Sequence, residues 1–562
     1  MAGLRLFFLL FSIFVAAFAE NAFAEDRYFD GSKFDRQLQK IVDGKGKTEP
    51  IVAAAVAVMI GDRLVFQSAA GCAEFNAEGT ACVREMTPTS KLRVASISKM
   101  ALALGMMTLV EDGRLDLERN VSDYLGWPLL NPAYPDLPIT ARQLLSHTSS
   151  LVDPEQYWLA APGDFSAFLS AQTDLYDRDH APGEWFRYAN INYGVLAAVI
   201  EKASGERFDR FMTKALFKPE GLDIGYNWSG VAKASRAAGA GLYYRDGDHF
   251  SAAVDSPAVL ADPLPYFLAQ EGLDRQAYLE SYRPGENSTL FSPQGGLRAS
   301  AVDLAKLVRL LETRASMTEP HWRFDEAAPN GETEDGFFAA FGLGSQEIIG
   351  TKKFLPGSIL IGHSGEAYGL HSGAWLIKGG ETKSSGEDIS VAFVSTGVGD
   401  APKEGAHPSF NLVEEQLLRL AVDAGEAAEE PQPFDETANA MRDVDRAIER
   451  AKTSGKRPLL VLGGNWCHDS RGLAKKFQTK RLSALIDENY ELVWIDVGNK
   501  DRNLDVPKRF GVERIIGTPT ILILSPEGAL LNADSVHDWR TADSRSIDET
   551  LDYFGAYAGS RK

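Results

Sequence analysis

The sequence predicts two consecutive domains: an α+β domain, with one antiparallel sheet and an inserted helical subdomain, and then a smaller α/β domain. Strand-like apolar segments occur near the start, at 51–60 and 64–66, and again within 338–397, with helical segments between them. An acidic, proline-bearing stretch at 425–434 has the composition of a linker. At 562 residues, the chain exceeds the size of one ordinary domain.

The first domain is predicted to span 27–424, and its elements follow from apolar periodicity. Gly61-Asp62 forms a turn between the two N-terminal strands, and residues 220–290 show too little pattern to predict an element. The predicted helices are 34–41, 100–110, 193–203, 299–307 and 412–422, and the predicted late strands are 338–341, 359–361, 374–377 and 391–394.

Beyond a linker at 425–437, the second domain is predicted over 438–562. Strands and helices alternate there, which is typical of a compact α/β fold. The predicted order is helix 440–453, strand 458–462, helix 473–477, strand 492–497, strand 521–524 and helix 547–554.

Residues 1–24 have the pattern of a signal peptide. Arg5 precedes a mostly apolar run over 6–19, and Ala-x-Ala cleavage sites follow at 17–19 and 22–24. An uncleaved membrane anchor is the alternative, but the run is short for a span and no later segment is long enough. We therefore expect an exported protein, periplasmic or secreted, with no stable membrane span after cleavage.

The formal net charge of −20 opposes binding to nucleic acid and to anionic lipid. We therefore expect a small-molecule or peptide substrate and no nucleic-acid partner. No sequence pattern implies a metal ion or an organic cofactor.

The chain contains three cysteines. Cys72 and Cys82 lie close together in a connection rich in Gly, Asn and Glu, and an exported protein allows them to pair. We favour a Cys72–Cys82 disulfide over two free thiols, which leaves Cys467 unpaired.

Ser96 is followed three residues later by Lys99, where an apolar segment changes into the helix beginning near Met100. Residues three apart share a helix face, so the Lys99 amine can lie beside the Ser96 hydroxyl. The start of a helix also offers unpaired backbone N–H groups and a positive dipole end. These features suit nucleophilic acyl transfer, although Ser-x-x-Lys occurs by chance about once in a chain of this length.

Two further motifs follow in the order of a known family: Tyr188-Ala189-Asn190 and His363-Ser364-Gly365. With them, residues from about 30 to 425 resemble the penicillin-recognising serine hydrolases, in the branch of class C β-lactamases, D,D-carboxypeptidases, D-aminopeptidases and esterases. Four supporting segments also match this family: 145–149, Pro182-Gly183, 295–297 before 303–304, and Gly362-His363. The resemblance implies a β-lactamase/transpeptidase-like fold.

The resemblance also implies a role for each matching residue. Ser96 would be the nucleophile that forms an acyl-enzyme, and Lys99 would lower the cost of deprotonating it. Tyr188 is favoured as the base for acylation and as the acid toward the leaving group, although which of Lys99 and Tyr188 takes the proton is left open. Asn190 would orient the substrate amide. The backbone N–H groups of Ser96 and Glu366 would form the oxyanion hole.

Three positions depart from the family pattern or invite another interpretation. His363 begins the third motif, where many β-lactamases have lysine, and a neutral histidine binds a carboxylate weakly, which favours a peptidase or esterase. Ser150 replaces a usual glycine and predicts an altered backbone turn. His147 is expected to be structural.

In the second domain, Trp466-Cys467-His468-Asp469-Ser470 resembles the active-site turn of thioredoxin-like proteins. Gly517-Thr518-Pro519-Thr520 resembles their cis-proline loop. The second cysteine of their motif is replaced by Ser470, so Cys467 alone cannot complete a dithiol–disulfide cycle. We favour a redox-inactive docking domain for a protein partner, with mixed-disulfide formation or peroxide sensing as alternatives.

Together these observations predict an exported serine acyl-hydrolase that acts on an amide or ester, such as a peptide or cell-wall fragment containing D-amino acids. The predicted site is Ser96, Lys99 and Tyr188, with Asn190, His363, Ser364, Gly365 and Glu366 binding substrate. The alternatives are a carboxylesterase or weak β-lactamase with the same residues, or a non-catalytic, penicillin-binding-like docking protein.

Overall fold

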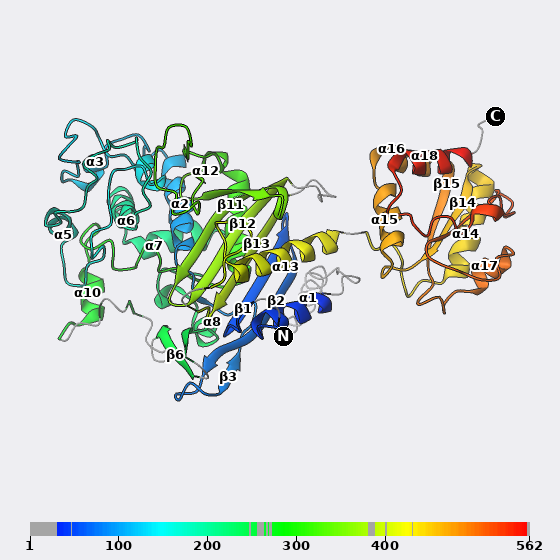
Figure 1. Cartoon of the computed structure of the whole chain (residues 1–562), viewed down its shortest axis with the longest axis horizontal. Coiled ribbons are helices and arrows are strands. Elements are labelled where there is room, and N and C mark those ends of the chain that lie inside the picture. The colour runs from blue at the N-terminus through cyan, green and yellow to red at the C-terminus, as the bar shows by residue number, and fades with distance from the viewer. Residues whose placement is uncertain are drawn as a thin grey trace, which may run out of the picture. The chain divides into compact units, whose positions relative to one another are not determined.

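The computed structural model of the chain describes residues 31–558 except 46–47, 247–248, 256–263, 266–267, 269–271, 380–387, 400–401 and 430. The predicted signal peptide at 1–24 lies outside the described residues. Two compact units divide the described chain, one over Gly31–Ala428 and one beginning at Glu429 (Figure 1). No helix in the described ranges has both the length and the apolar character needed to cross a membrane.

The first unit is built on a nine-stranded sheet whose neighbouring strands all pair antiparallel. The N-terminal and C-terminal strands meet where β1 pairs with β13, from Ala53 opposite Thr396 to Ile60 opposite Ile389. This confirms the predicted antiparallel sheet. The spatial order is β3 (Cys82–Glu85), β2 (Arg63–Phe75), β1 (Ala53–Ile60), β13 (Ile389–Thr396), β12 (Leu370–Gly379), β11 (Phe354–Ala367), β10 (Gln346–Thr351), β9 (Ala340–Phe341) and β8 (Trp322–Arg323).

Helices pack against this sheet and bury its strands. In Figure 1, α13 (Leu412–Glu429) crosses in front of the strands, and α1 (Ser32–Val42) lies beside β2. Helix α2 (Ile97–Glu111) packs against β11 and β12, and α11 (Ala301–Arg309) packs against β13, β1 and β12. The sequence of α2 is apolar on nearly every side, as expected for a helix enclosed in a core.

The segment between the early and late strands forms the predicted helical subdomain, centred on the buried helix α6. Its helices are α3 (Val121–Leu125), α4 (Ala141–Leu145), α5 (Phe165–Ser170), α6 (Ile191–Ser204), α7 (Phe208–Met212), α8 (Lys233–Ala237), α10 (Arg275–Ser281) and α12 (Ala315–Thr318). Short helical turns occur at Thr213–Phe217, Trp228–Gly230 and Leu310–Thr313. Two small sheets pair β4 (Leu92–Arg93) with β7 (Arg298–Ala299), and β5 (Leu242–Asp246) with β6 (His249–Val254).

The β5–β6 hairpin lies in the region where the sequence predicted no element. Tertiary contacts explain the difference: the Tyr243 hydroxyl accepts a hydrogen bond from Phe75 N at 3.2 Å, and Phe75 stacks on Phe250 at 4.3 Å. The hairpin therefore depends on residues of β2 that are distant in the sequence, and a local pattern does not contain this information.

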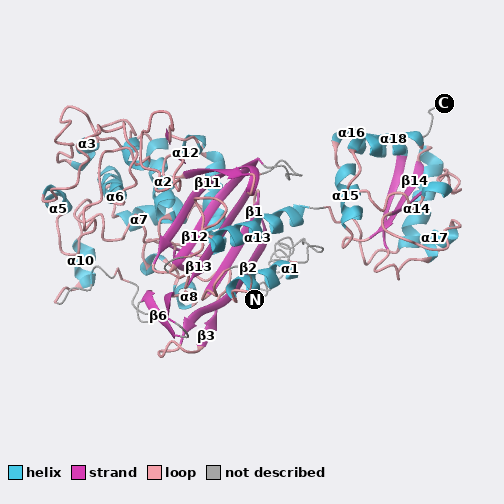
Figure 2. Cartoon of the chain, in the orientation of Figure 1, coloured by secondary structure: helices cyan, strands magenta, loops and turns pink. Residues whose placement is uncertain are grey.

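The second unit is a three-stranded sheet with helices on both sides (Figure 2). β14 is central and contributes Leu460 and Leu462 to one core and Leu459 and Val461 to another, as the alternation of a strand requires. The elements are α14 (Ala440–Ser454), β14 (Arg457–Gly463), α15 (His468–Phe477), α16 (Lys480–Asn489), β15 (Tyr490–Asp496), α17 (Asp505–Arg509), β16 (Thr520–Ile523) and α18 (Ile547–Ala556). The predicted α/β alternation is confirmed, and α16 and α17 are additional to it.

Candidate active site

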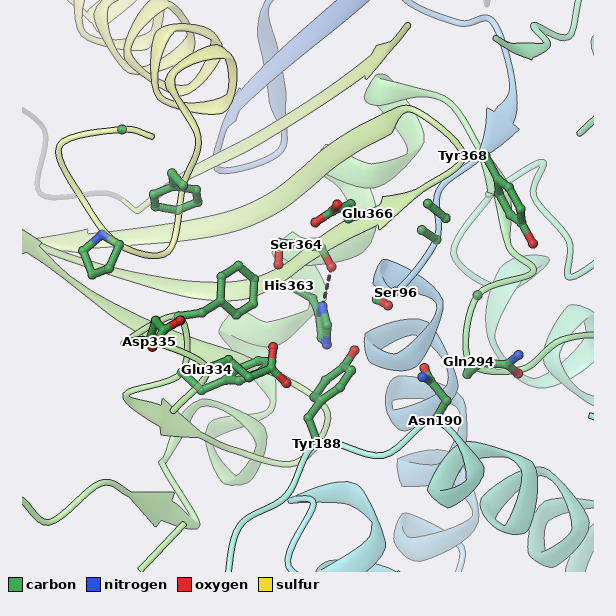
Figure 3. A pocket seen from close by; sticks show the side chains of 18 of the residues that line it. Ser96, Tyr188, Asn190, Gln294, Glu334, Asp335, His363, Ser364, Glu366 and Tyr368 are labelled. Carbon is green, nitrogen blue, oxygen red and sulfur yellow. Dashed lines mark hydrogen bonds between the residues drawn. The ribbon is translucent and has the colours of Figure 1, made fainter. Parts of the chain in front are cut away.

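Ser96 lies at a sharp junction between a strand and a helix (Figure 3). Strand β4 ends at Arg93, Ala95 has a left-handed backbone with φ of +46°, and α2 begins at Ile97. A non-glycine residue in this conformation is strained and persists only where its surroundings hold it. The junction places the Ser96 hydroxyl on a pocket surface at the N-terminal end of a buried helix.

Lys99 lies one helical turn beyond Ser96 and is completely buried. Its Nζ donates hydrogen bonds to Ser96 Oγ at 3.0 Å, to Asn190 Oδ1 at 2.9 Å and to the Gln294 carbonyl at 3.1 Å. Burial disfavours the charged amine and lowers the pKa of Lys99 to about 7, while the Asp153 carboxylate opposes this shift. Lys99 can therefore lose and accept a proton near neutral pH.

Asn190 links the second motif to Lys99, and Asp153 fixes the orientation of its amide. Asp153 accepts hydrogen bonds from Asn190 N at 2.8 Å, Asn190 Nδ2 at 2.9 Å and Ile191 N at 2.7 Å. The amide oxygen of Asn190 therefore points to Lys99. One amide hydrogen is left to contact a substrate, since the NH₂ group carries two.

The Tyr188 ring is held in a stack of aromatic side chains. Its centroid lies 4.3 Å from that of His147 and 4.9 Å from that of Phe338, and Lys99 Nζ lies 4.7 Å from it. Burial raises the pKa of Tyr188 well above its usual range, and a hydrogen bond with Ser96 only partly offsets this. At neutral pH the hydroxyl therefore keeps its proton.

His147 supports the site from behind Tyr188. Its Nδ1 accepts hydrogen bonds from Ala189 N at 3.1 Å and Asn192 Nδ2 at 3.2 Å, and burial holds its pKa well below the usual value. These contacts are structural. Nearby, Ser150 has a left-handed backbone with φ of +64°, a conformation that glycine favours.

The third motif lies near the end of β11, where one edge of the strand is open. Backbone pairing with β10 stops at Gly362, whereas pairing with β12 continues to Ala367. A Cβ atom at Gly365 would lie 2.5 Å from the Val94 carbonyl and 3.2 Å from Ser96 N. The absence of a side chain thus allows β11 to approach the Ser96 backbone, and Glu366 follows next along the strand.

His363 is buried beneath the pocket, with an exposed fraction of only 1%. Its Nδ1 lies 2.5 Å from the Ser364 carbonyl, and burial together with the nearby Lys99 lowers the pKa of His363 to about 3. Ser364 donates its backbone N–H and its hydroxyl to Gln346 Oε1, at 2.9 and 3.0 Å. His363 is therefore neutral where a lysine would be charged.

These side chains line a pocket of about 590 Å³. Ser96, Tyr188, Asn190, His363, Ser364 and Glu366 reach it from α2, from the segment before α6 and from β11 (Figure 3). Asp153, Gln294 and the acidic pair Glu334 and Asp335 were not predicted, because none of them belongs to a local sequence motif. No group of three or more His, Cys, Asp or Glu side chains that could hold a metal occurs in the described ranges.

The cysteines lie outside this pocket. Cys72 and Cys82 are joined by a disulfide with a Cα–Cα distance of 5.7 Å, between β2 and β3. Cys467 belongs to the second unit, where it precedes α15; its Sγ lies 3.5 Å from the Thr518 carbonyl and the Thr518–Pro519 peptide bond is cis. The Cys467 side chain is buried, whereas its neighbour Trp466 is exposed.

Comparison with curated proteins shows similarity to penicillin-binding protein 4* of Bacillus subtilis (strain 168), 30% identical over 196 residues. This alignment covers 34% of the chain and 40% of that protein, and alignments with Staphylococcus aureus Protein flp cover 27–36% of those proteins. The chain thus spans between about a quarter and two fifths of the length of these curated relatives.

Two solved structures are similar to parts of this chain. The D-amino acid amidase from Ochrobactrum anthropi SV3 is 18% identical, with a TM-score of 0.46, and the alignment covers 70% of this chain and 99% of that one. The disulphide isomerase from Xylella fastidiosa Temecula1 is 33% identical, with a TM-score of 0.22, over 23% of this chain and 97% of that one.

The matches to protein families agree with the two units of the structure. Residues 439–526 match a family described as thioredoxin-like. Residues 38–413, two thirds of the chain, match the family described as Beta-lactamase. The chain therefore belongs to the beta-lactamase family and carries a C-terminal thioredoxin-like domain.

Proposed function

We propose that the chain is an exported serine acyl-hydrolase that cleaves an amide or ester through an acyl-enzyme on Ser96. One observation carries the proposal: a buried Lys99 amine with a pKa of about 7 lies 3.0 Å from the Ser96 hydroxyl. A nucleophile on the pocket surface and a buried base within hydrogen-bond distance of it are the essential parts of this chemistry.

In acylation, neutral Lys99 accepts the Ser96 proton while Oγ bonds to the substrate carbonyl carbon. Negative charge then develops on the carbonyl oxygen, which the backbone N–H groups of Ser96 and Glu366 stabilise. The close approach of β11 at Gly365 supports this pairing of donors. Lys99 rather than Tyr188 is the base in this proposal, since burial lowers the pKa of the amine and raises that of the phenol.

Collapse of the tetrahedral intermediate breaks the bond to the leaving amine or alcohol. Tyr188 donates its proton to the departing atom and regains one from protonated Lys99, which restores the neutral amine. Water then attacks the acyl-enzyme by the same route and releases the acid. Asn190 orients the substrate through its remaining amide hydrogen.

The proposed substrates are peptides or cell-wall fragments that contain D-amino acids, in the periplasm or outside the cell. The family motifs and the similarity to a penicillin-binding protein support this class. The neutral His363 favours a peptidase or esterase over a dedicated β-lactamase, since a charged group for a substrate carboxylate is missing at that position.

A neutral alkyl fluorophosphonate probe tests the serine mechanism. Wild type should be labelled at Ser96, and Ser96→Ala should lose all labelling, while Ser170→Ala, on the surface of α5, should be labelled like wild type. Absent labelling of wild type, or equal labelling of Ser96→Ala, would refute the proposal and favour a non-catalytic docking protein. Turnover of p-nitrophenyl esters, D-alanyl peptides and nitrocefin would then separate esterase, peptidase and β-lactamase.

For the second unit we propose a redox-inactive docking module for a protein partner. Cys72 and Cys82 form a disulfide with each other, and Cys467 is the third and last cysteine of the chain. The chain therefore has no second free thiol that could resolve a mixed disulfide on Cys467. A disulfide-reduction assay should show no activity that depends on Cys467. Activity in wild type that disappears in Cys467→Ser would overturn this assignment.

A further inference from the structure

The carboxylates of Glu334, Asp335, Glu366 and Glu404 line the pocket, and no ion pair or side-chain hydrogen bond joins them to another described residue. Figure 3 shows Glu334 and Asp335 on one side of Ser96, which we call the acidic side. Burial raises the pKa of Glu334, and repulsion from the carboxylates of Glu332 and Glu366 adds to this shift. The pocket lining therefore concentrates negative charge beside the nucleophile, and Arg93 is the one lysine or arginine among the described lining residues.

The lining residue with a permanent positive charge is Arg93, and it belongs to another part of the wall. Its Nε donates to the Gly295 carbonyl at 2.7 Å, its Nη2 donates to Ser292 at 3.0 Å, and its guanidinium lies over the Tyr368 ring. In Figure 3, Tyr368 lies across Ser96 from Glu334 and Asp335. Arg93 thus leaves the acidic side uncompensated.

His363 supplies a second and independent feature of the same side. Its Nδ1 contacts a carbonyl oxygen, which can only accept, so Nδ1 carries the proton of the neutral ring and Nε2 carries a lone pair. Nε2 is buried without a hydrogen-bond partner among the described residues, and His363 lines the pocket. A buried acceptor without a protein partner is satisfied by a water molecule or by a donor from a ligand.

The position of Glu334 relates this acidic side to the reaction. Its charge acts on the Tyr188 hydroxyl, and Figure 3 shows Glu334, Tyr188 and His363 together, with Asn190 and Gln294 on the other side of Ser96. Since Tyr188 donates to the leaving group in the proposed mechanism, the carboxylates face the leaving-group portion of the substrate.

We propose that this side of the pocket binds a positively charged group, such as an alkylammonium, on the leaving-group portion of the substrate. The carboxylates provide the attraction and His363 Nε2 accepts a hydrogen bond from the ligand. The preferred substrates are then amides or esters whose amine or alcohol part carries a second, free amino group. This inference rests on the proposed function of Ser96.

Two isosteric esters test the inference without a known substrate. 3-(Aminomethyl)phenyl acetate and 3-ethylphenyl acetate carry the ammonium or the ethyl group on the leaving-group portion, and each acylates Ser96 and so competes with the neutral fluorophosphonate probe. We expect the ammonium compound to inhibit labelling about tenfold more strongly than the ethyl compound, a difference of about 1.4 kcal/mol. The difference should shrink as salt is raised, because exposed charges are screened.

The variant Glu334→Gln removes one charge from the acidic side and should lower the ratio between the two inhibitors several-fold. Glu334→Lys should abolish the preference for the ammonium compound. The matched control Glu220→Gln changes an exposed glutamate outside the pocket and should retain this preference. Equal inhibition by both compounds, inhibition by neither, or an unchanged ratio in Glu334→Lys would overturn the inference. Normal labelling by the fluorophosphonate in those cases would leave the proposed function standing, whereas absent labelling would refute both.

Discussion

The reactive group of the site is controlled by the burial of one amine. Lys99 is fully enclosed, and the two oxygens that contact it besides Ser96 are the neutral acceptors Asn190 Oδ1 and the Gln294 carbonyl. Neutral acceptors stabilise an ammonium less than a carboxylate does, so desolvation prevails and the pKa decreases to about 7. Asp153 contacts Lys99 only through Asn190, and its carboxylate charge raises the Lys99 pKa, which offsets part of the decrease.

The rate of Ser96 acylation should therefore rise with pH. Below the Lys99 pKa of about 7 the amine is protonated and cannot accept the Ser96 proton; above it the amine is neutral and the rate levels off. The measurement is the second-order rate constant for fluorophosphonate labelling as a function of pH. The raised pKa of Tyr188 predicts no decline on the alkaline side up to about pH 9.

Lys99→Arg is the matched variant for this prediction, because arginine keeps its charge throughout the range and should lose labelling at every pH. A profile for wild type that is flat from about pH 5 to 9 would contradict the assignment of Lys99 as the base.

Replacing Asp153 should change both the rate and the pH profile. Asp153→Asn removes a charge that raises the Lys99 pKa, so the rising part of the profile should move to lower pH. The same variant weakens the hydrogen bonds that orient the Asn190 side chain. We therefore expect the maximal labelling rate to fall about tenfold.

The control is Asp136→Asn, which changes an exposed aspartate of the same unit and should leave the profile unaltered. A purely structural role for Asp153 predicts a lower rate with an unmoved profile, so the shift in pH distinguishes the two roles.

At the scale of elements, the site depends on the junction between β4 and α2 meeting the open end of β11. Ser372 in β12 closes this contact, because its hydroxyl lies 3.2 Å from the Val94 carbonyl and 3.2 Å from the Gly365 carbonyl. The late strands β11 and β12 thus contact the backbone that leads into Ser96.

Gly365→Ala should separate these elements. The added Cβ would lie 2.5 Å from the Val94 carbonyl and 2.6 Å from Ser372 Oγ, so β11 must move away from Ser96. We expect labelling to fall at least a hundredfold, since displacement of an oxyanion donor costs about that much, and unfolding free energy to fall by about 1–3 kcal/mol.

Gly399→Ala is the corresponding control, because a Cβ at that glycine would meet no atom within 4 Å. Labelling and urea unfolding measured for both variants give the comparison. Normal labelling in a folded Gly365→Ala protein would show that β11 does not supply the oxyanion contact.

At the scale of the whole molecule, each unit has its own hydrophobic core. The buried apolar side chains of the first unit lie within residues 34–424, and those of the second unit lie within residues 434–554. The Ser96 pocket is lined by residues of the first unit alone. The thioredoxin-like domain is therefore not needed to assemble the pocket.

A chain ending at Pro433 should fold and should be labelled by the fluorophosphonate at the rate of the full chain. The cut precedes Phe434, which packs in a core of the second unit and hydrogen bonds to Asn465. Circular dichroism and labelling of both proteins test this. Loss of labelling in a folded truncated protein would show that the second domain contributes to the site.

The sequence by itself determined the features that depend on neighbouring residues. Apolar periodicity located β1, α2 and β14, and the order of three short motifs identified the family, because strand and helix patterns and turn motifs are local. The same information fixed the identities of Ser96, Lys99 and Tyr188 as candidates.

Only the tertiary structure determined the surroundings, the orientation and the pKa of these side chains. Lys99 and Gln294 are 195 positions apart, and Asp153 and Asn190 are 37 apart, yet these contacts set the amine's surroundings and the orientation of the amide. The acidic side with Glu334 and the open end of β11 likewise arise from chain segments that meet only on folding. Burial and distance control pKa and charge recognition, and neither is encoded in a local pattern.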